Sequence, residues 1–185
     1  MKISLVIPYL ETDISKREVL SKCLESMAGQ YSELIVIADE IDNLSEKINL
    51  GISKSSGDYI VVSNDDLTLL KGTLDDLCDP DRVTVPKVVF GLDKLFHGHI
   101  WCMPRKIYED VGPMYEGYDR FYYDDSDYWM SIEAKGYEII KREDVVVVHP
   151  RPATTFSKLY KKGRIEANKK IFIERWGADA HRRVE

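Results

Sequence analysis

The sequence has few cysteines, no long apolar run and no excess of positive over negative charge. Three cysteines, Cys23, Cys78 and Cys102, are scattered along 185 residues. An odd number at this spacing fits neither a disulfide framework nor a zinc site. No window approaches the ~20 apolar residues that a membrane-spanning helix needs, and the first residues lack the charged and apolar regions of a signal peptide. We therefore expect a protein of the reducing cytoplasm.

The net charge of −6 excludes the overall basic character of a nucleic-acid-binding protein. A glycine-rich phosphate loop is also missing, because residues 8–12, which follow the first predicted strand, contain no glycine. What the chain does have is 44% hydrophobic residues, without internal repeats or a low-complexity linker. A chain of this length can bury roughly 70% of its unfolded surface, which is enough for one globular domain.

The first half of the chain alternates short β-branched runs with amphipathic stretches. Unbroken apolar runs of this length are typical of strands buried on both faces. Ser15 with Glu18 and Asn43 with Glu46 are capping patterns that open two helices. The predicted order is strand 3–7, helix 15–28, strand 34–37, a helix from Asn43 that Gly57 ends, and strand 59–63. This alternation predicts an α/β fold with a mostly parallel, twisted sheet and helices on both faces.

The second half is less regular. We expect a strand at 83–90, a helix from Pro104 to Val111, a helix from Asp124 that ends at Gly136, strands near 137–140 and 145–148, and a helix from Thr155 to Trp176. The exposed side of that last helix is strongly basic. A solvated helix face explains such a pattern, and contact with an anionic membrane surface is the alternative.

Asn64, Asp65 and Asp66 directly follow the predicted strand 59–63. In an open α/β sheet, ligands bind beyond the carboxyl ends of the strands. Carboxylate oxygens bind divalent cations, and the phosphates of a nucleotide often complete the coordination. The pattern therefore predicts a cation and a phosphate-bearing ligand at this point. A plain turn is the alternative, since Asn and Asp are favoured wherever a strand stops.

A second acidic group, Asp124, Asp125 and Asp127, opens a predicted helix. Carboxylates are stabilised at the start of a helix, but one cap accounts for only one of the three. Crowded like charges raise the pKa of at least one carboxyl group and the helix start lowers it, so the sequence leaves the balance open. A moderately raised pKa would make such a group a better general base near neutral pH.

Two further polar residues follow predicted strands. Asp39 comes after the strand at 34–37, and His149 comes after the strand at 145–148, so both should lie at the same edge of the sheet as Asp66. His97 and His99 have no spacing typical of a metal site, and we expect both to be loop residues.

Taken in order, these segments resemble the family 2 glycosyltransferases, which have the GT-A fold, over nearly the whole chain. The matching segments are residues 4–8, residues 34–39, the run Asn49, Gly51, Gly57 and Tyr59-Ile60, Asn64-Asp65-Asp66 at the D-x-D position, residues 104–112, Asp124-Asp125-Ser126-Asp127 at the E-D-x-D box, Gly136-Tyr137, His149, and Trp176-Gly177. Each motif is weak alone, and their joint order and spacing are specific.

The resemblance implies an inverting enzyme that moves one sugar from a UDP-, GDP- or dTDP-sugar to a hydroxyl of a carbohydrate or glycoconjugate acceptor. It implies a donor-binding half at 1–95, an acceptor and catalytic half at 96–150, and a basic helical tail at 151–185. The implied site residues are Asp66 and His149 for Mn²⁺ or Mg²⁺, Asp125 and then Asp124 as general base, Pro8, Asp39, Lys54, Asn64 and Asp65 for the donor nucleotide, and Trp101 and Asp127 for the acceptor.

Three positions depart from the family pattern. Asn64 replaces the first acid of D-x-D, Ala38 replaces a frequent aspartate, and Ser131 stands where an arginine is common. A non-catalytic nucleotide-sugar binding module of the same fold would show such departures, whereas the retained acidic residues and histidine favour an enzyme. A nucleotidyltransferase of similar architecture is a third interpretation, and the missing glycine loop argues against it.

Overall fold

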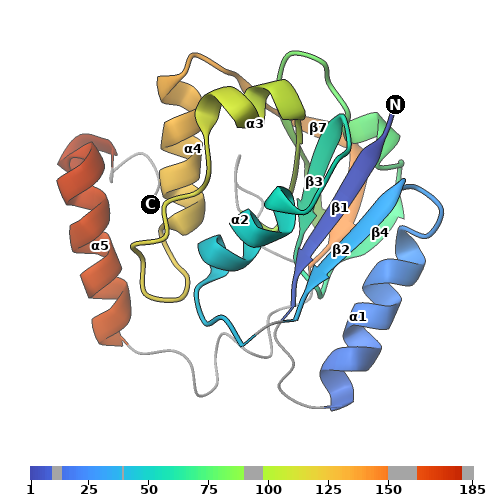
Figure 1. Cartoon of the computed structure of the whole chain (residues 1–185), viewed down its shortest axis with the longest axis horizontal. Helices are drawn as coiled ribbons and strands as arrows, with labels where there is room; N and C mark the ends of the chain where they lie inside the picture. Colours follow the sequence, from blue (N-terminus) through green and yellow to red (C-terminus); the bar gives the residue numbers. More distant parts are fainter. Residues whose placement is uncertain (10–13, 39, 90–97, 150–161, 181–185) are drawn as a thin grey trace.

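A seven-stranded mixed sheet forms the centre of the structure, which is a computed structural model (Figure 1). The structure describes residues 1–9, 14–38, 40–89, 98–149 and 162–180. The strands are β1 (Ile3–Pro8), β2 (Glu33–Ile37), β3 (Tyr59–Ser63), β4 (Thr68–Lys71), β5 (Val83–Val89), β6 (Ile100–Pro104) and β7 (Ile139–Val148), in the spatial order β2-β1-β3-β6-β5-β7-β4.

Parallel and antiparallel neighbours occur in equal number in this sheet. β1 is parallel to β2 and β3, and β5 is parallel to β7, whereas β6 is antiparallel to β3 and β5 and β4 is antiparallel to β7. The predicted α/β fold is confirmed, and the prediction of a mostly parallel sheet holds only approximately. The antiparallel direction of β6 matters most, because it brings the amino end of this central strand beside the carboxyl ends of β3 and β5.

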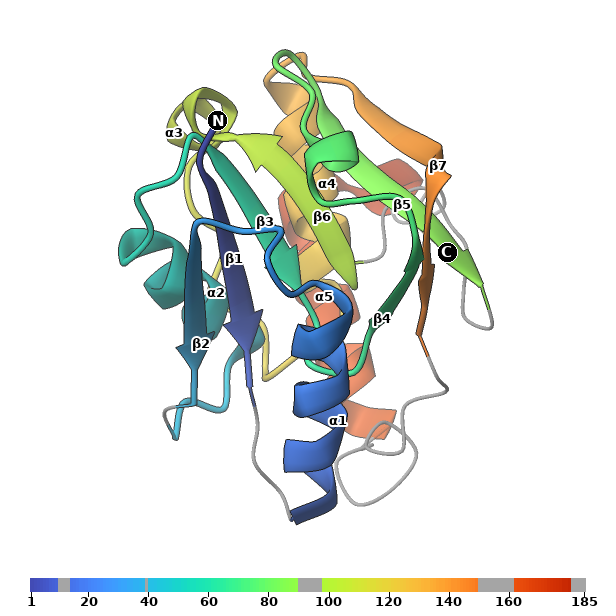
Figure 2. The same cartoon turned by 90° about the vertical axis from the view of Figure 1, so that its right-hand side faces the viewer.

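The described residues form five α-helices and one short 3₁₀ helix around the sheet. They are α1 (Ile14–Ser26), α2 (Leu44–Ser53), η1 (Asp75–Leu77), α3 (Arg105–Val111), α4 (Asp124–Ala134) and α5 (Lys162–Trp176). α1 lies on one face of the sheet, α2, α3 and α4 lie on the other, and α5 packs outside α4 (Figures 1 and 2). In the described part of the chain, no helix combines the length and apolar character that crossing a membrane requires.

Alternation along the central strands builds a core on each face of the sheet. Ile60 and Val62 of β3 join the cluster beneath α2 and α4, whereas Val61 joins the cluster beneath α1. Successive side chains of a strand point to opposite faces, so an unbroken apolar run is what a strand covered on both sides requires. The interpretation of residues 59–63 as a strand buried on both faces is therefore confirmed.

Two glycines allow the close packing of α2 and its following loop against β1. A Cβ atom on Gly51 would lie 2.4 Å from Cγ1 of Val6, and one on Gly57 would lie 2.7 Å from the backbone nitrogen of Ser4. Distances this short exclude any side chain. The glycines of the Asn49–Ile60 run are thus packing residues that fix how the α2 crossover meets the sheet.

Most predicted elements are present, with some corrections. Asn43 caps α2 as expected, since its side chain accepts a hydrogen bond from the Glu46 N–H. The two strands predicted near 137–140 and 145–148 form the single strand β7, which bends where its register against β5 shifts beside Pro86. Neither β4 nor η1 was predicted. The last helix is described from Lys162 onwards, and its predicted start lies outside the described residues.

Candidate active site

Several polar residues lie together at one edge of the sheet, meaning here the side at which the parallel strands have their carboxyl ends. β1, β3, β5 and β7 run in the same direction and end at this edge, and the antiparallel β6 begins there. Asn64 after β3, His149 after β7 and His99 before β6 are therefore neighbours. The backbone N–H of Asn64 donates a hydrogen bond to the carbonyl oxygen of His99 over 2.7 Å.

Asp66 and His149 form the centre of this cluster. The Nε2 atom of His149 lies 3.1 Å from Oδ1 of Asp66, and both side chains are largely buried. Oδ1 is fully buried and accepts no well-aligned hydrogen bond from the residues that the structure describes. Burial works to raise the pKa of Asp66, but the contact with His149 and its charge outweigh burial, so the pKa is lowered. Asp66 is therefore held as a carboxylate.

This pair fits a divalent cation of the kind that the resemblance implies. A buried carboxylate oxygen without a hydrogen bond is costly unless a ligand satisfies it. Two ligands bound at about 2.1 Å and roughly at right angles lie about 3 Å apart, which is the observed Asp66–His149 spacing. Among the described residues, no three His, Cys, Asp or Glu side chains are grouped to hold a metal ion. Ligand phosphates and water would have to complete the coordination, as is common for Mg²⁺ sites.

His99 belongs to the same cluster, which the sequence did not predict. Its ring stacks on that of His149, with centroids 4.0 Å apart and an interplanar angle of 29°. The amide group of Asn64 lies 3.4 Å from Nδ1 of His99 and 3.5 Å from Nε2 of His149. His99 is a loop residue, as expected, but only the antiparallel direction of β6 brings it to this edge. His97 lies outside the described residues.

Asp65 contacts α1. Its Oδ1 lies 3.4 Å from Nζ of Lys16, and both side chains are largely buried. Burial raises the pKa of Asp65, and the charge of Lys16 opposes that effect. Pro8 ends β1 at the same edge. Asp39, which was predicted to bind the nucleotide, lies outside the described residues.

The second acidic group reaches this edge through Gly98, the residue before His99. Asp124 and Asp125 are the first residues of α4, and the N-cap position is Tyr123, whose side chain makes no capping hydrogen bond. A Cβ atom on Gly98 would lie 2.8 Å from Cβ of Asp125, so the two residues are in direct contact. Oδ1 of Asp125 accepts the Ser126 N–H over 2.7 Å. Three acidic residues stand in the first turn of α4, but none of them is the N-cap.

Asp124 is buried, with 6% of its surface exposed, and it lies beside Asp125. Burial, and secondly the charge of Asp125, raise its pKa to about 7 from an ordinary value of 3.8. The sequence left open whether crowded charges or the helix start would dominate the pKa values of these groups. For Asp124, burial and the charge of Asp125 raise the pKa more than hydrogen bonds from the backbone lower it.

Asp124→Asn is expected to remove a pH dependence of stability. A carboxyl group with a raised pKa favours the folded state when protonated, and this contribution is lost as pH rises towards the folded pKa of about 7. About 2–3 kcal/mol of that loss should fall between pH 5 and pH 8. Thermal unfolding should therefore show the variant gaining stability relative to wild type over this range.

Asp110→Asn is the matched control for this measurement. Asp110 is an exposed carboxylate paired with Lys135, and its pKa is lowered by that pairing. It is ionised in both states between pH 5 and pH 8, so the difference between this variant and wild type should stay constant. An Asp124→Asn difference that is equally constant would contradict the raised pKa.

Two predicted site residues lie away from this edge. Lys54 follows α2, and a helix that connects parallel strands returns the chain to their amino ends, so Lys54 lies at the opposite edge of the sheet. Trp101 is 0% exposed in the interior strand β6, where its ring packs 5.6 Å from that of Tyr128. We therefore correct both assignments: neither residue can contact a ligand at the candidate site in this structure.

The side chain of Asp127 contacts α5. Its Oδ2 atom accepts hydrogen bonds from Tyr118 Oη (2.8 Å), Arg175 Nε (2.6 Å) and Trp176 Nε1 (2.8 Å). The residue is only 1% exposed. The basic helix thus uses Arg175 to bind a carboxylate inside the molecule. The predicted contact of Asp127 with the acceptor stays a prediction. In this structure its carboxylate already accepts hydrogen bonds from three side chains.

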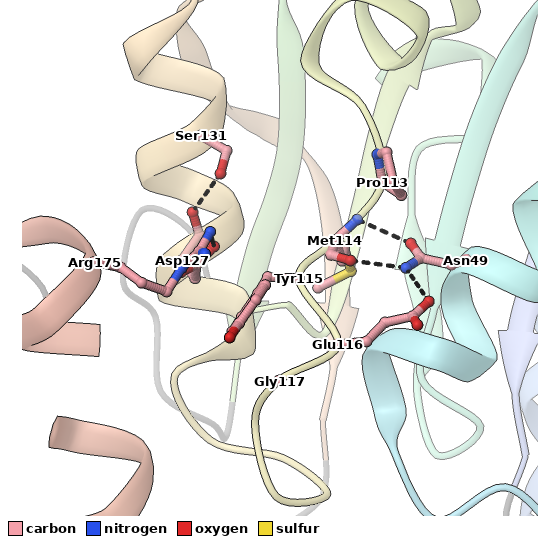
Figure 3. A pocket seen from close by; sticks show the side chains of 9 residues that line it. All are labelled: Asn49, Pro113, Met114, Tyr115, Glu116, Gly117, Asp127, Ser131 and Arg175. Atoms are coloured by element: carbon pink, nitrogen blue, oxygen red, sulfur yellow. Dashed lines mark hydrogen bonds and ion pairs between the residues drawn. The ribbon is translucent and has the colours of Figure 1, made fainter. Parts of the chain in front are cut away.

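A cavity of about 470 Å³ lies between α4, α5 and the loop after α3 (Figure 3). Its lining residues are Asn49, Pro113, Met114, Tyr115, Glu116, Gly117, Asp127, Ser131 and Arg175. The guanidinium of Arg175 stacks on the Tyr115 ring at 3.7 Å. Asn49 fixes the loop by bonding both the N–H and the carbonyl oxygen of Met114.

No protein-family model matches the sequence. No curated protein matches it either. Solved structures do match. The catalytic domain of Drosophila beta1,4galactosyltransferase 7, in complex with xylobiose, superposes with a TM-score of 0.71 at 16% identity, over 92% of this chain and 79% of that chain.

Two further structures extend this likeness. GalNAc-T7 with UDP, GalNAc and Mn²⁺ matches with a TM-score of 0.75 at 11% identity; the match covers 97% of this chain but only 50% of the GalNAc-T7 chain. A mutant of the Drosophila enzyme, in complex with manganese, UDP-Gal and xylobiose, matches with a TM-score of 0.64 at 16% identity, over 91% of this chain and 79% of that chain. The structural neighbours of this chain are thus GT-A glycosyltransferases, and the chain has the GT-A fold.

Proposed function

We propose that the protein transfers one sugar from a nucleotide-diphospho-sugar to an acceptor hydroxyl, with inversion at the anomeric carbon. One observation carries this proposal: the short segment Gly98–His99 contacts both candidate groups. The His99 ring stacks on His149, the partner of Asp66, and Gly98 packs against Asp125. The candidate cation ligands, Asp66 and His149, and the candidate general base, Asp125, therefore lie on either side of one point at the edge of the sheet where ligands bind in such folds.

Asp125 would act as the general base. The acceptor oxygen attacks the anomeric carbon on the face opposite the diphosphate, its proton passes to a carboxylate oxygen of Asp125, and the bond between the anomeric carbon and the phosphate oxygen breaks. Asp66 and His149 would hold Mn²⁺ or Mg²⁺, which when bound neutralises negative charge on the leaving diphosphate. Asn64 lies within reach of the same ligand, and Asp65 stands beside it, fixed by Lys16.

The neighbouring structures support the coarse outline of this proposal. The structures named above contain UDP with Mn²⁺, UDP-Gal with manganese, or xylobiose. Inversion, membership of family 2, and the identity of the base, sugar and acceptor are our inferences from the resemblance and from the position of Asp125.

A donor panel tests the proposal. UDP-, GDP- and dTDP-sugars are incubated with the protein and simple sugar acceptors in Mn²⁺, in Mg²⁺ and in excess chelator, and released nucleoside diphosphate is measured. We expect release from at least one donor in the presence of metal and little in chelator. A protein that binds a nucleoside diphosphate but releases none from any donor would instead be a non-catalytic nucleotide-sugar binding module.

A further inference from the structure

The loop that leads into α4 has an unusual backbone conformation. Arg120, Tyr122 and Tyr123 have φ angles of 64°, 77° and 72°. Among the described residues, these three are the only ones other than glycine with positive φ. Side chains with a Cβ atom disfavour this region, and such residues persist only where surrounding contacts impose the conformation. The carboxylates of Asp124 and Asp125 follow directly, so their positions depend on this loop.

A single buried side chain of α5 binds the backbone of the loop. Asn168 is 0% exposed. Its Oδ1 atom accepts the N–H of Asp119 over 2.9 Å. Its Nδ2 group lies within hydrogen-bond distance of the carbonyl oxygens of Asp119 (3.2 Å), Phe121 (3.0 Å) and Tyr122 (3.1 Å). Among the described residues, every hydrogen bond of the Asn168 side chain thus ends on residues 119–122, and the network itself fixes which amide atom is oxygen.

The same face of α5 also contacts the residues that flank Asp124 and Asp125 in the sequence. Phe172, one turn after Asn168, packs its ring 5.4 Å from that of Tyr123. Arg175, a further turn on, bonds Asp127 (Figure 3). Residues at spacings of four and seven share one face of a helix. α5 therefore binds α4 on both sides of Asp124 and Asp125.

We propose that Asn168 is a positioning residue for the reaction: it holds the 119–123 loop in its left-handed conformation and thereby places Asp125 against Gly98, beside the Asp66–His149 pair. This inference rests on the proposed function, because it assigns Asn168 an effect on the carboxylate that would take the acceptor proton. Asn168 itself touches no reacting group. Its proposed effect passes through the backbone of the loop.

The first test compares Asn168→Ala with Lys170→Ala, an exposed change two residues along the same helix. Misplacing a reacting group by about 1 Å can lower turnover by about 100-fold. We expect Asn168→Ala to lower turnover by about 10- to 100-fold while the dissociation constant of the nucleoside diphosphate with Mn²⁺ stays near that of wild type. Lys170→Ala should match wild type in both. Equal turnover in the two variants would overturn the proposal.

Rescue separates positioning from general destabilisation. Glycine adopts positive φ without strain. Adding Tyr122→Gly to Asn168→Ala should therefore recover most of the lost turnover, whereas adding Tyr122→Ala, which removes the same ring but keeps a Cβ atom, should recover none. Equal recovery by both changes, or no recovery by either, would overturn the assigned cause.

Hydrogen exchange keeps this inference separable from the proposed function. In Asn168→Ala the amides of residues 119–127 should exchange faster than in wild type, while those of β1 and β3 should not change. If wild type transfers no sugar, the proposed function fails, and the exchange result still decides whether Asn168 holds the loop. Unchanged exchange in residues 119–127 would overturn the inference whatever the activity.

Discussion

Asp125→Asn is expected to lower turnover by about 10²–10⁴-fold, the usual contribution of a general base. The substitution keeps the shape of the side chain and an oxygen that can accept the Ser126 N–H, so the start of α4 should remain intact. It removes the proton acceptor. Asp125 contacts Gly98, whereas Asp66 faces His149, so binding of the nucleoside diphosphate should stay near that of wild type. Steady-state turnover and calorimetric binding measure the two effects separately.

The neighbouring carboxyl group provides the comparison for this variant. Asp124 is buried and has a pKa of about 7, so it could also accept a proton near neutral pH. We expect Asp124→Asn to lower turnover less than Asp125→Asn, because Asp125 is the more exposed of the two and touches Gly98. Normal turnover in Asp125→Asn, with a large loss in Asp124→Asn, would transfer the role of base to Asp124.

Asp66→Ala is expected to abolish the metal-dependent stabilisation of the protein by a nucleoside diphosphate. Ligand at about 100 times its dissociation constant stabilises wild type by roughly 2.7 kcal/mol. For a domain of this size, that corresponds to a rise in melting temperature of roughly 5–10 °C. The variant lacks the buried oxygen that faces His149, so nucleotide with Mn²⁺ should shift its melting temperature little. Thermal unfolding, read without any assay of transfer, measures this.

Two controls make the result for Asp66 decisive. The variant without ligand is melted first, and a melting temperature close to that of wild type shows that it is folded. Asp81→Ala removes an exposed carboxylate before β5, at the opposite edge of the sheet, and should keep the full shift. If wild type shows the same shift in excess chelator, the nucleotide is held without a metal ion, and the assignment of Asp66 and His149 as cation ligands is wrong.

Several features of the site follow from the sequence because they depend on local patterns. The apolar run 59–63 predicts a strand, and the polar residues after it lie at the carboxyl edge, as the general rule for open α/β sheets requires. His149 reaches that edge for the same reason. The start of α4 at Asp124 and the capping of α2 by Asn43 also follow from short-range signals. These predictions needed only the direction of the strands and the period of the helices.

Other features depend on contacts between distant segments, which no local pattern specifies. Lys54 was expected to bind the donor nucleotide, but it follows α2, which returns the chain to the amino ends of the parallel strands at the other edge of the sheet. Trp101 was expected at the acceptor, but β6 is an interior strand with helices over its face, and the ring is buried. His99 gave no signal of a site, because its place depends on β6 running antiparallel to β3.

The sequence by itself determined the α/β architecture, the acidic turn after β3 and the acidic start of α4, since each depends on patterns within short stretches of the chain. Tertiary structure alone decided which of those residues meet. It stacked His99 on His149, placed Gly98 against Asp125 and raised the pKa of Asp124 by burying it. It also made Asn168 the partner of a loop almost fifty residues earlier in the chain. Burial and long-range contact depend on the whole fold, so these properties appear only once the sheet and its helices are assembled.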